Sequence, residues 1–178
     1  RNVILYLKSN AICVIKEIPQ KRILNMCNVF EVAKKICEAG NWEVTNLQLQ
    51  KMLYIAQVLY IGQSDTNHHL FRANFEAWDY GPVAPMVYHQ FKIFGNKPIQ
   101  AWAFPSTEND CSNEENTFID VIAKLLVQMK PSRLVSLTHR VGTGWYKNYS
   151  PGAIGQRISE EDMLDEYRKV WLPNVKKD

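Results

Sequence analysis

A Gly-Pro corner inside an aromatic stretch is the feature that most constrains how this chain can fold. Residues 75–88 read F-E-A-W-D-Y-G-P-V-A-P-M-V-Y. Gly81 and Pro82 are expected to turn the chain, and Pro85 suits the first turn of a helix, where a missing N–H costs little. The pattern predicts a rigid aromatic corner that leads into a short helix. Such a corner indicates a shaped surface more than a reaction centre.

The fold class predicted from the whole chain is mainly α: a single compact helical domain with short extended or irregular segments. At 178 residues and 46% apolar composition, the chain is long enough to bury a core without covalent staples. Apolar periodicity and capping residues favour helices over 28–39, 45–60, 85–94, 117–130, 131–137 and 159–170. We expect an extended or irregular segment over 70–78, extended chain over 97–105, and loops over 106–116 and 142–155.

Three segments are expected along the chain: an N-terminal extension of open status over 1–25, the helical domain over 26–172, and a basic tail over 173–178. The extension holds five basic residues and one acidic residue, Glu17, so its formal charge is +4. Because the whole chain carries +3, the remainder has a formal charge near −1. A near-neutral body argues against nucleic acid as the partner. A DNA-binding autoregulator would have to use residues 1–25.

The apolar runs of the extension are interrupted by the polar residues 8–10, so they are too short to cross a bilayer, and no membrane partner is expected. The four cysteines and four histidines form no C-x-x-C pair and no zinc spacing, so no metal and no cofactor are expected. A reducing cytoplasm fits this cysteine usage, with a single disulfide left open.

Catalysis has little support in the sequence. There is no nucleophile elbow, no phosphate-binding glycine loop and no dinucleotide fingerprint. The enzyme alternative is a composite site in which His89 and His139 meet a tyrosine or a carboxylate in one pocket. Convergence of these residues in the fold would favour it, and scattered histidines would count against it.

The aromatic residues favour a binding surface. The residues Trp78, Tyr80, Tyr88 and Trp145 lie in or beside turn-rich segments rather than inside long helices. Tryptophan and tyrosine in such places supply the large rigid area and the polar atom from which protein-binding hot spots are made.

Three blocks of the sequence together resemble the Panacea-domain family, which includes SocA-like antitoxins and phage-associated proteins. Residues 45–57, T-N-L-Q-L-Q-K-M-L-Y-I-A-Q, are similar to the family's T-N-L-K-L-Q-K-L-L-Y-F-A-Q block. Residues 75–88 resemble its F-E-A-W-x-Y-G-P-V-x-P-x-V-Y signature. The closing L-T-H…P-W…I-S pattern is similar to residues 137–139, 145–146 and 158–159. The blocks occur in the family's order and cover about 28–170.

The resemblance implies the antitoxin half of a toxin–antitoxin pair. The expected partner is a protein toxin encoded nearby, bound directly in the cytoplasm, with delivery to a cytoplasmic protease as a further step and a homo-oligomer left open. The residues expected to form the binding surface are Trp78, Tyr80, Gly81, Pro82, Tyr88, His139 and Trp145. The chain departs from the pattern at Gly144, where the family commonly has proline, so we expect a more flexible loop there.

Overall fold

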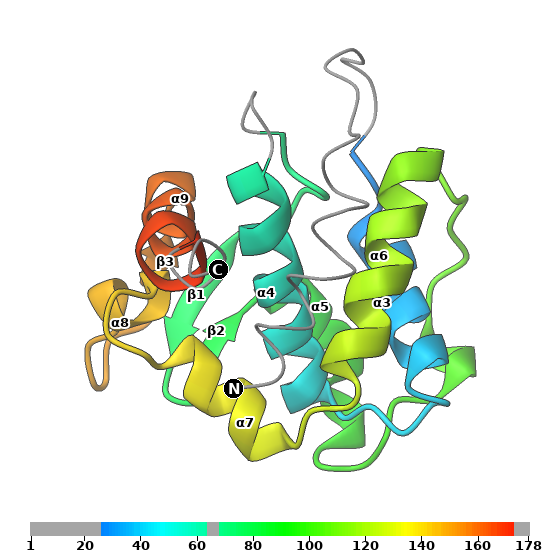
Figure 1. The fold of residues 1–178 in the computed structure, drawn as a ribbon. Helices are drawn as coiled ribbons and strands as arrows, with labels where there is room; N and C mark the ends of the chain where they lie inside the picture. Colours follow the sequence, from blue (N-terminus) through cyan, green and yellow to red (C-terminus); the bar gives the residue numbers. More distant parts are fainter. Residues whose placement is uncertain (1–25, 64–67, 173–178) are drawn as a thin grey trace.

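Helix α4 (Asn46–Gln63) runs through the centre of the computed structural model, which describes residues 26–63 and 68–172 (Figure 1). Its start is the predicted capping box. The Thr45 backbone N–H donates to Gln48 Oε1 at 3.0 Å, and the Gln48 N–H donates to Thr45 Oγ1 at 3.4 Å. These bonds satisfy donors that the first helical turn would otherwise leave unpaired.

The central position of α4 buries it on every side. The predicted apolar face, with Leu49, Met52 and Leu53, is buried as expected. The opposite face is buried too, because helices and a strand from other parts of the chain pack around α4. Polar side chains such as Gln50 and Lys51 are therefore carried into the interior. Each of them needs a partner there, since an unpaired buried polar group is costly.

Helices α3 (Val29–Ala39) and α6 (Asn113–Leu126) pack against each other on one side of α4 (Figure 1). The predicted cap of α3 is confirmed, since Asn28 Oδ1 accepts the Phe30 N–H at 2.9 Å. Helix α6 begins before the expected residue 117. Its capping box joins Ser112 and Glu115, so the prediction of a loop through 116 was wrong.

A disulfide between Cys27 and Cys111 joins the segments that lead into these two helices. The sequence had left a single disulfide open. The third described cysteine, Cys37, is a buried free thiol, and burial raises its pKa to about 12. It behaves as a small apolar side chain.

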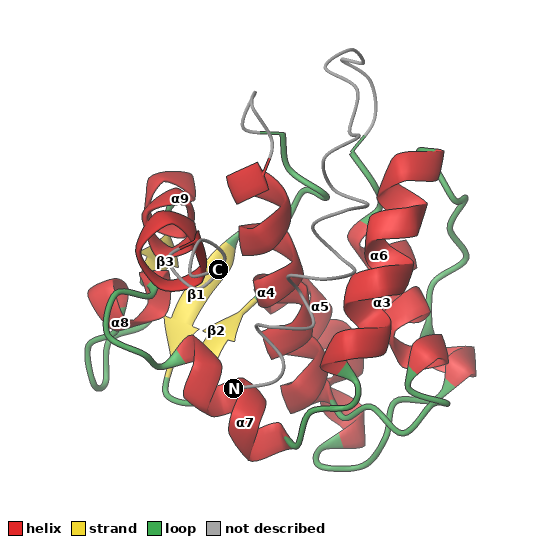
Figure 2. Cartoon of the chain, viewed as in Figure 1, coloured by secondary structure: helices red, strands yellow, loops and turns green. Residues whose placement is uncertain are grey.

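A small antiparallel sheet lies on the other side of α4 (Figure 2). Strand β1 (Phe75–Trp78) lies between β2 (Gly81–Val83) and β3 (Arg157–Ile158), in the order β2-β1-β3. The prediction of an extended or irregular segment over 70–78 is confirmed, since irregular chain leads into β1. The β1–β2 hairpin contains the Gly-Pro corner.

Short helices complete the fold, and the prediction of a mainly α class is confirmed. They are α5 (Pro85–Phe91), which continues as the 3-10 turn η2 (Lys92–Phe94), η3 (Ala101–Ala103), α7 (Pro131–Thr138), α8 (Gly144–Asn148), α9 (Glu160–Glu166) and its π-helical continuation η4 (Tyr167–Trp171). Two predictions were wrong in part: η3 lies inside the supposed extended stretch and α8 inside the supposed loop. Across the described ranges, no helix combines the length and the apolar character that a bilayer crossing requires.

Candidate functional site

The turn between β1 and β2 presents one of the more exposed aromatic side chains of the molecule. Strand β1 ends at Trp78 and β2 begins at Gly81, so Asp79 and Tyr80 form the turn. The Tyr80 side chain is 72% exposed. Gly81 follows with φ of +102°, a conformation that residues with a Cβ rarely adopt. Glycine is thus required to place Tyr80 at the tip.

Helix α8 holds this turn from one side. The Trp145 indole N–H donates to the Trp78 carbonyl at 2.7 Å. The Tyr149 hydroxyl donates to Asp79 Oδ1 at 3.0 Å. The rings of Trp145 and Tyr149 are themselves stacked, with centroids 4.5 Å apart. The first half of the turn is consequently attached to one rigid aromatic pair.

Helix α4 also contacts this hairpin, through a lysine. Lys51 is fully buried, and its Nζ donates to the Pro82 carbonyl at 2.9 Å. Among the ion pairs of the described residues, none includes Lys51. Burial without a counter-charge lowers the pKa of Lys51 to about 7.

His139 caps α7 beside this lysine. Its ring stacks on Trp145, with centroids 3.8 Å apart and planes 5° from parallel. Burial, and next the charge of Lys51, lower the pKa of His139, while a hydrogen bond with the Tyr80 backbone opposes them. Its Nε2 atom is buried and has no hydrogen-bond partner among the described residues.

The close packing around Gly81 also leaves no room for a side chain at this position. A Cβ at this position would lie 2.8 Å from Lys51 Cε and 2.9 Å from His139 Nε2. Both approaches are closer than real Cβ atoms make, so a side chain would displace one of the groups that hold the turn.

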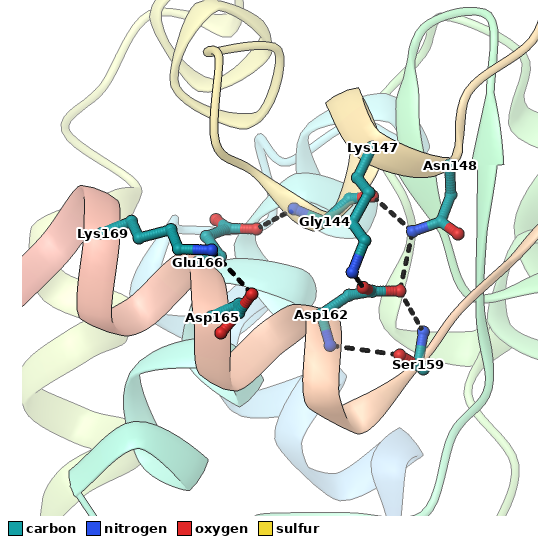
Figure 3. A network of polar contacts seen from close by, with 8 residues as sticks. All are labelled: Gly144, Lys147, Asn148, Ser159, Asp162, Asp165, Glu166 and Lys169. Atoms are coloured by element: carbon teal, nitrogen blue, oxygen red, sulfur yellow. Dashed lines mark hydrogen bonds and ion pairs between the residues drawn. The ribbon is translucent and has the colours of Figure 1, made fainter.

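A polar network fixes α8 itself against α9 (Figure 3). Asp162 of α9 accepts a hydrogen bond from Asn148 at 2.8 Å and forms an ion pair with Lys147. Burial would raise the pKa of Asp162, but hydrogen bonds from Lys147, Asn148 and Ser159 outweigh it and lower that pKa to about 2. The carboxylate is thus held in its charged form at the contact between the two helices.

Glu166 anchors the start of α8 more deeply. Its carboxylate accepts from the Tyr54 hydroxyl at 2.6 Å, the Gly144 backbone N–H at 2.8 Å and the Trp171 indole at 3.0 Å. A Cβ on Gly144 would lie 2.7 Å from both the Tyr54 hydroxyl and Ile158 Cγ2. The expectation of a flexible loop at Gly144 was wrong, because this residue opens a helix and is packed on both sides.

The predicted binding residues come together around the hairpin, but they differ in exposure. Tyr80 is exposed, whereas Gly81, Pro82 and Trp145 are buried. The half-buried members of the set are Trp78, Tyr88 and His139. The Trp78 ring packs edge-to-face on Tyr88, with centroids 4.9 Å apart. Their part in binding a partner stays a prediction.

The two histidines of the enzyme alternative have different surroundings. His89 is exposed and packs on the rings of Tyr88 and Trp78. His139 stacks on Trp145, and no contact found in the described ranges joins the two imidazoles. In those same ranges, histidine, cysteine and acidic side chains form no group of three or more that could hold a metal ion.

Lys51 is the residue of this site that sequence reasoning missed. The signal was present: it lies between Leu49 and Met52, within the apolar pattern of α4. A lysine in that position has to reach an acceptor inside the protein, because its helix offers it no solvent.

Comparison with known proteins agrees with the motifs. A family model described as antitoxin SocA-like, Panacea domain, matches residues 49–146, a range that includes Lys51, the turn and Trp145. The chain is 31% identical over 140 residues to Antitoxin SocA of Caulobacter vibrioides (strain NA1000 / CB15N), an alignment that covers 70% of this chain and 72% of that protein. No solved structure matches the chain. The chain therefore belongs to the antitoxin SocA-like, Panacea domain family.

Proposed function

We propose that this chain is an antitoxin that neutralises a protein toxin by binding it directly, with the Tyr80 turn at the centre of the contact. The family supports the class of function. The observation that carries the proposal is that Tyr80, 72% exposed, sits on a turn held by hydrogen bonds from side chains of α4 and α8.

The physical argument is preorganisation. Binding costs free energy whenever a loop or side chain has to be ordered, so a surface that is already rigid retains more of its interaction energy. Backbone carbonyls on both sides of the turn, at Trp78 and Pro82, accept hydrogen bonds from the body of the protein. Tyr80 can therefore act as an anchor residue that fills a pocket on the partner.

Two further exposed side chains extend this surface. Val141, in the corner between α7 and α8, is 76% exposed, and Tyr146 on α8 is 53% exposed. With Tyr80 they would give an apolar contact area whose edges are polar, as in typical protein interfaces.

The mechanism requires no bond chemistry. Covering the toxin's active surface is sufficient, and delivery of the bound toxin to a cytoplasmic protease is a second step that the same contact could serve. In a reducing cytoplasm Cys27 and Cys111 would be held as thiols, so the proposal does not depend on their disulfide.

The test begins with the open reading frames adjacent to the gene. Each is expressed alone and together with this chain, and a frame that arrests growth alone but not in co-expression encodes the toxin. Tyr80→Ala should abolish the rescue while leaving the thermal midpoint unchanged, because an exposed side chain contributes little to stability. Trp102→Ala is the matched control, since Trp102 is 76% exposed on η3.

Two outcomes would contradict the proposal. One is the absence of any adjacent frame that is toxic alone and silenced by this chain. The other is full rescue by a folded Tyr80→Ala variant, which would remove the turn from the contact. Toxin half-life with and without the chain separates the mechanisms: a stable toxin indicates covering, and a shortened half-life indicates delivery to a protease.

A further inference from the structure

Acidic residues are missing from a long stretch of this chain. Between Asp120 and Glu160 there is no aspartate or glutamate, whereas the basic residues of this stretch are Lys124, Lys130, Arg133, Arg140, Lys147 and Arg157. The stretch forms the end of α6, all of α7 and α8, and the approach to β3. Strongly one-signed segments of this kind create a local potential that selects partners of opposite charge.

Two arginines stand out within that stretch, one at each end of α7. Arg133 lies in the first turn of the helix, and Arg140 directly follows its C-cap, His139. Both are half-buried. Burial, and next the positive charge of Arg133, lower the pKa of Arg140.

Within the described ranges, neither arginine has a carboxylate as an ion-pair partner. The four ion pairs found among the described residues involve Lys35, His69, Lys147 and Lys169, and neither arginine is in them. Lys147, by contrast, is paired with Asp162. Two neighbouring cations without a counter-charge repel each other, so an anionic partner would gain from binding both.

The position of the pair connects it with the proposed contact surface. Arg140 lies between His139 and the exposed Val141, and its carbonyl accepts a hydrogen bond from the Thr143 hydroxyl at 2.8 Å. Helix α7 packs on β2 and α8 packs on β1, so the segment that carries the two arginines borders the hairpin that carries Tyr80. Asp79, the acidic residue of the turn, accepts a hydrogen bond from the Tyr149 hydroxyl at 3.0 Å.

We propose that the toxin presents carboxylate side chains to Arg133 and Arg140, so that an acidic face of the toxin covers α7 and its corner with α8. This inference rests on the proposed function, because it names the chemistry of that partner. Arginine suits the task, since its planar fork bonds both oxygens of a carboxylate and it is enriched at interface hot spots.

An acidic protein is favoured over nucleic acid as the occupant. A nucleic-acid site needs a series of cations that follows the phosphates, whereas this corner offers one fixed arginine pair beside exposed Val141 and Tyr146. Apolar contact with a charged edge is the anatomy of a protein interface.

The test uses the full chain and the toxin found in the rescue experiment. Association rates are measured at about 50 mM and 300 mM salt for wild type and for the double variant Arg133→Glu with Arg140→Glu. Wild-type association should slow as salt rises, and the double variant should associate at least about tenfold more slowly and lose that salt dependence. Lys124→Glu is the control of equal sign on α6, which lies on the other side of α4 from α8 (Figure 1).

Two further probes separate the possible failures. Poly-L-glutamate should bind wild type in a salt-dependent way and should not bind the double variant. If poly-L-glutamate gives this result although no adjacent frame is toxic, the proposed function is wrong, but the binding of acidic chains by the two arginines is supported. If the double variant is folded and binds toxin at the wild-type rate, the inference is overturned. It is also overturned if the double variant binds toxin as wild type does but no longer binds a 20-base-pair DNA that wild type binds.

Discussion

Two fully buried ionisable residues, Glu166 and Lys51, hold the two sides of the candidate site in different ways. Glu166 accepts from Tyr54, from Gly144 and from Trp171, so three hydrogen-bond donors converge on its carboxylate. Lys51 has an ammonium group with three protons to donate, and the hydrogen bond it makes in the structure goes to the Pro82 carbonyl.

Glu166 is thus a buried group with several hydrogen bonds, whereas Lys51 is a buried cation with one among the described residues. Several hydrogen bonds offset the desolvation penalty of a buried charge and stabilise one arrangement of its neighbours. A buried charge with few partners keeps most of that penalty uncompensated. The α8–α9 side is therefore expected to be the more stable of the two. The turn side carries a group whose protonation changes near pH 7.

The largest effect is expected from Glu166→Ala. The substitution leaves the Tyr54 hydroxyl, the Gly144 N–H and the Trp171 indole without their acceptor. Stranding buried donors in this way should lower the free energy of unfolding by about 3–5 kcal/mol. Urea denaturation measures the loss.

Asp165→Ala is the control for that experiment. Asp165 pairs with Lys169 four residues on, at the surface of the same helical segment. An exposed pair of this kind contributes less than about 1 kcal/mol. A loss of equal size in both variants would mean that the buried hydrogen bonds of Glu166 stabilise the fold no more than a surface ion pair does.

Gly144→Ala should have the next largest effect. The new methyl group would come within 2.7 Å of the Tyr54 hydroxyl and of Ile158 Cγ2, so α8 has to shift. Overpacking of this size costs about 1–3 kcal/mol. Gly152→Ala is the comparison: its φ of +76° brings a backbone cost, of about 1 kcal/mol, but the space around it is open. A Gly144 variant no less stable than the Gly152 variant would show that α8 yields easily.

Lys51→Met should change the pH dependence of stability. The folded pKa of Lys51, about 7, lies below the ordinary value of 10.5, so the unfolded chain binds more protons between these two pH values. The stability contributed by this group therefore rises with pH from about 7 to 10.5, and by no more than about 1.4 kcal/mol per pH unit. Denaturation at several pH values should show this rise in wild type and a flatter profile in the variant. Identical profiles would mean that Lys51 is protonated in the folded protein across the range.

Much of the fold follows from local signals. Asn28 starts α3 and Thr45 with Gln48 starts α4, because a cap satisfies the backbone with atoms a few residues away. The start of α6 was misplaced although its signal is equally local. The run of acidic and polar residues before it suggested a solvated loop and hid the capping box of Ser112 and Glu115.

The candidate site was predictable in its outline. The motifs pointed to the hairpin, to His139 and to Trp145, and the structure brings these together. Their mutual contacts were not predictable, since Trp78 and Trp145 are 67 residues apart and meet through one hydrogen bond. The role of Gly144 was misjudged for the same reason: its neighbours Tyr54 and Glu166 come from distant helices.

What the sequence alone determined is therefore most of the longer helices, the glycine that the turn at Gly81 requires and the family to which the chain belongs. These depend on short-range geometry and on residue patterns along the chain. What only the tertiary structure decided is which polar groups are buried and which partners they find, above all Lys51 under the turn and Glu166 beneath α8. Burial is a property of the packed elements together, so no local stretch of sequence contains it.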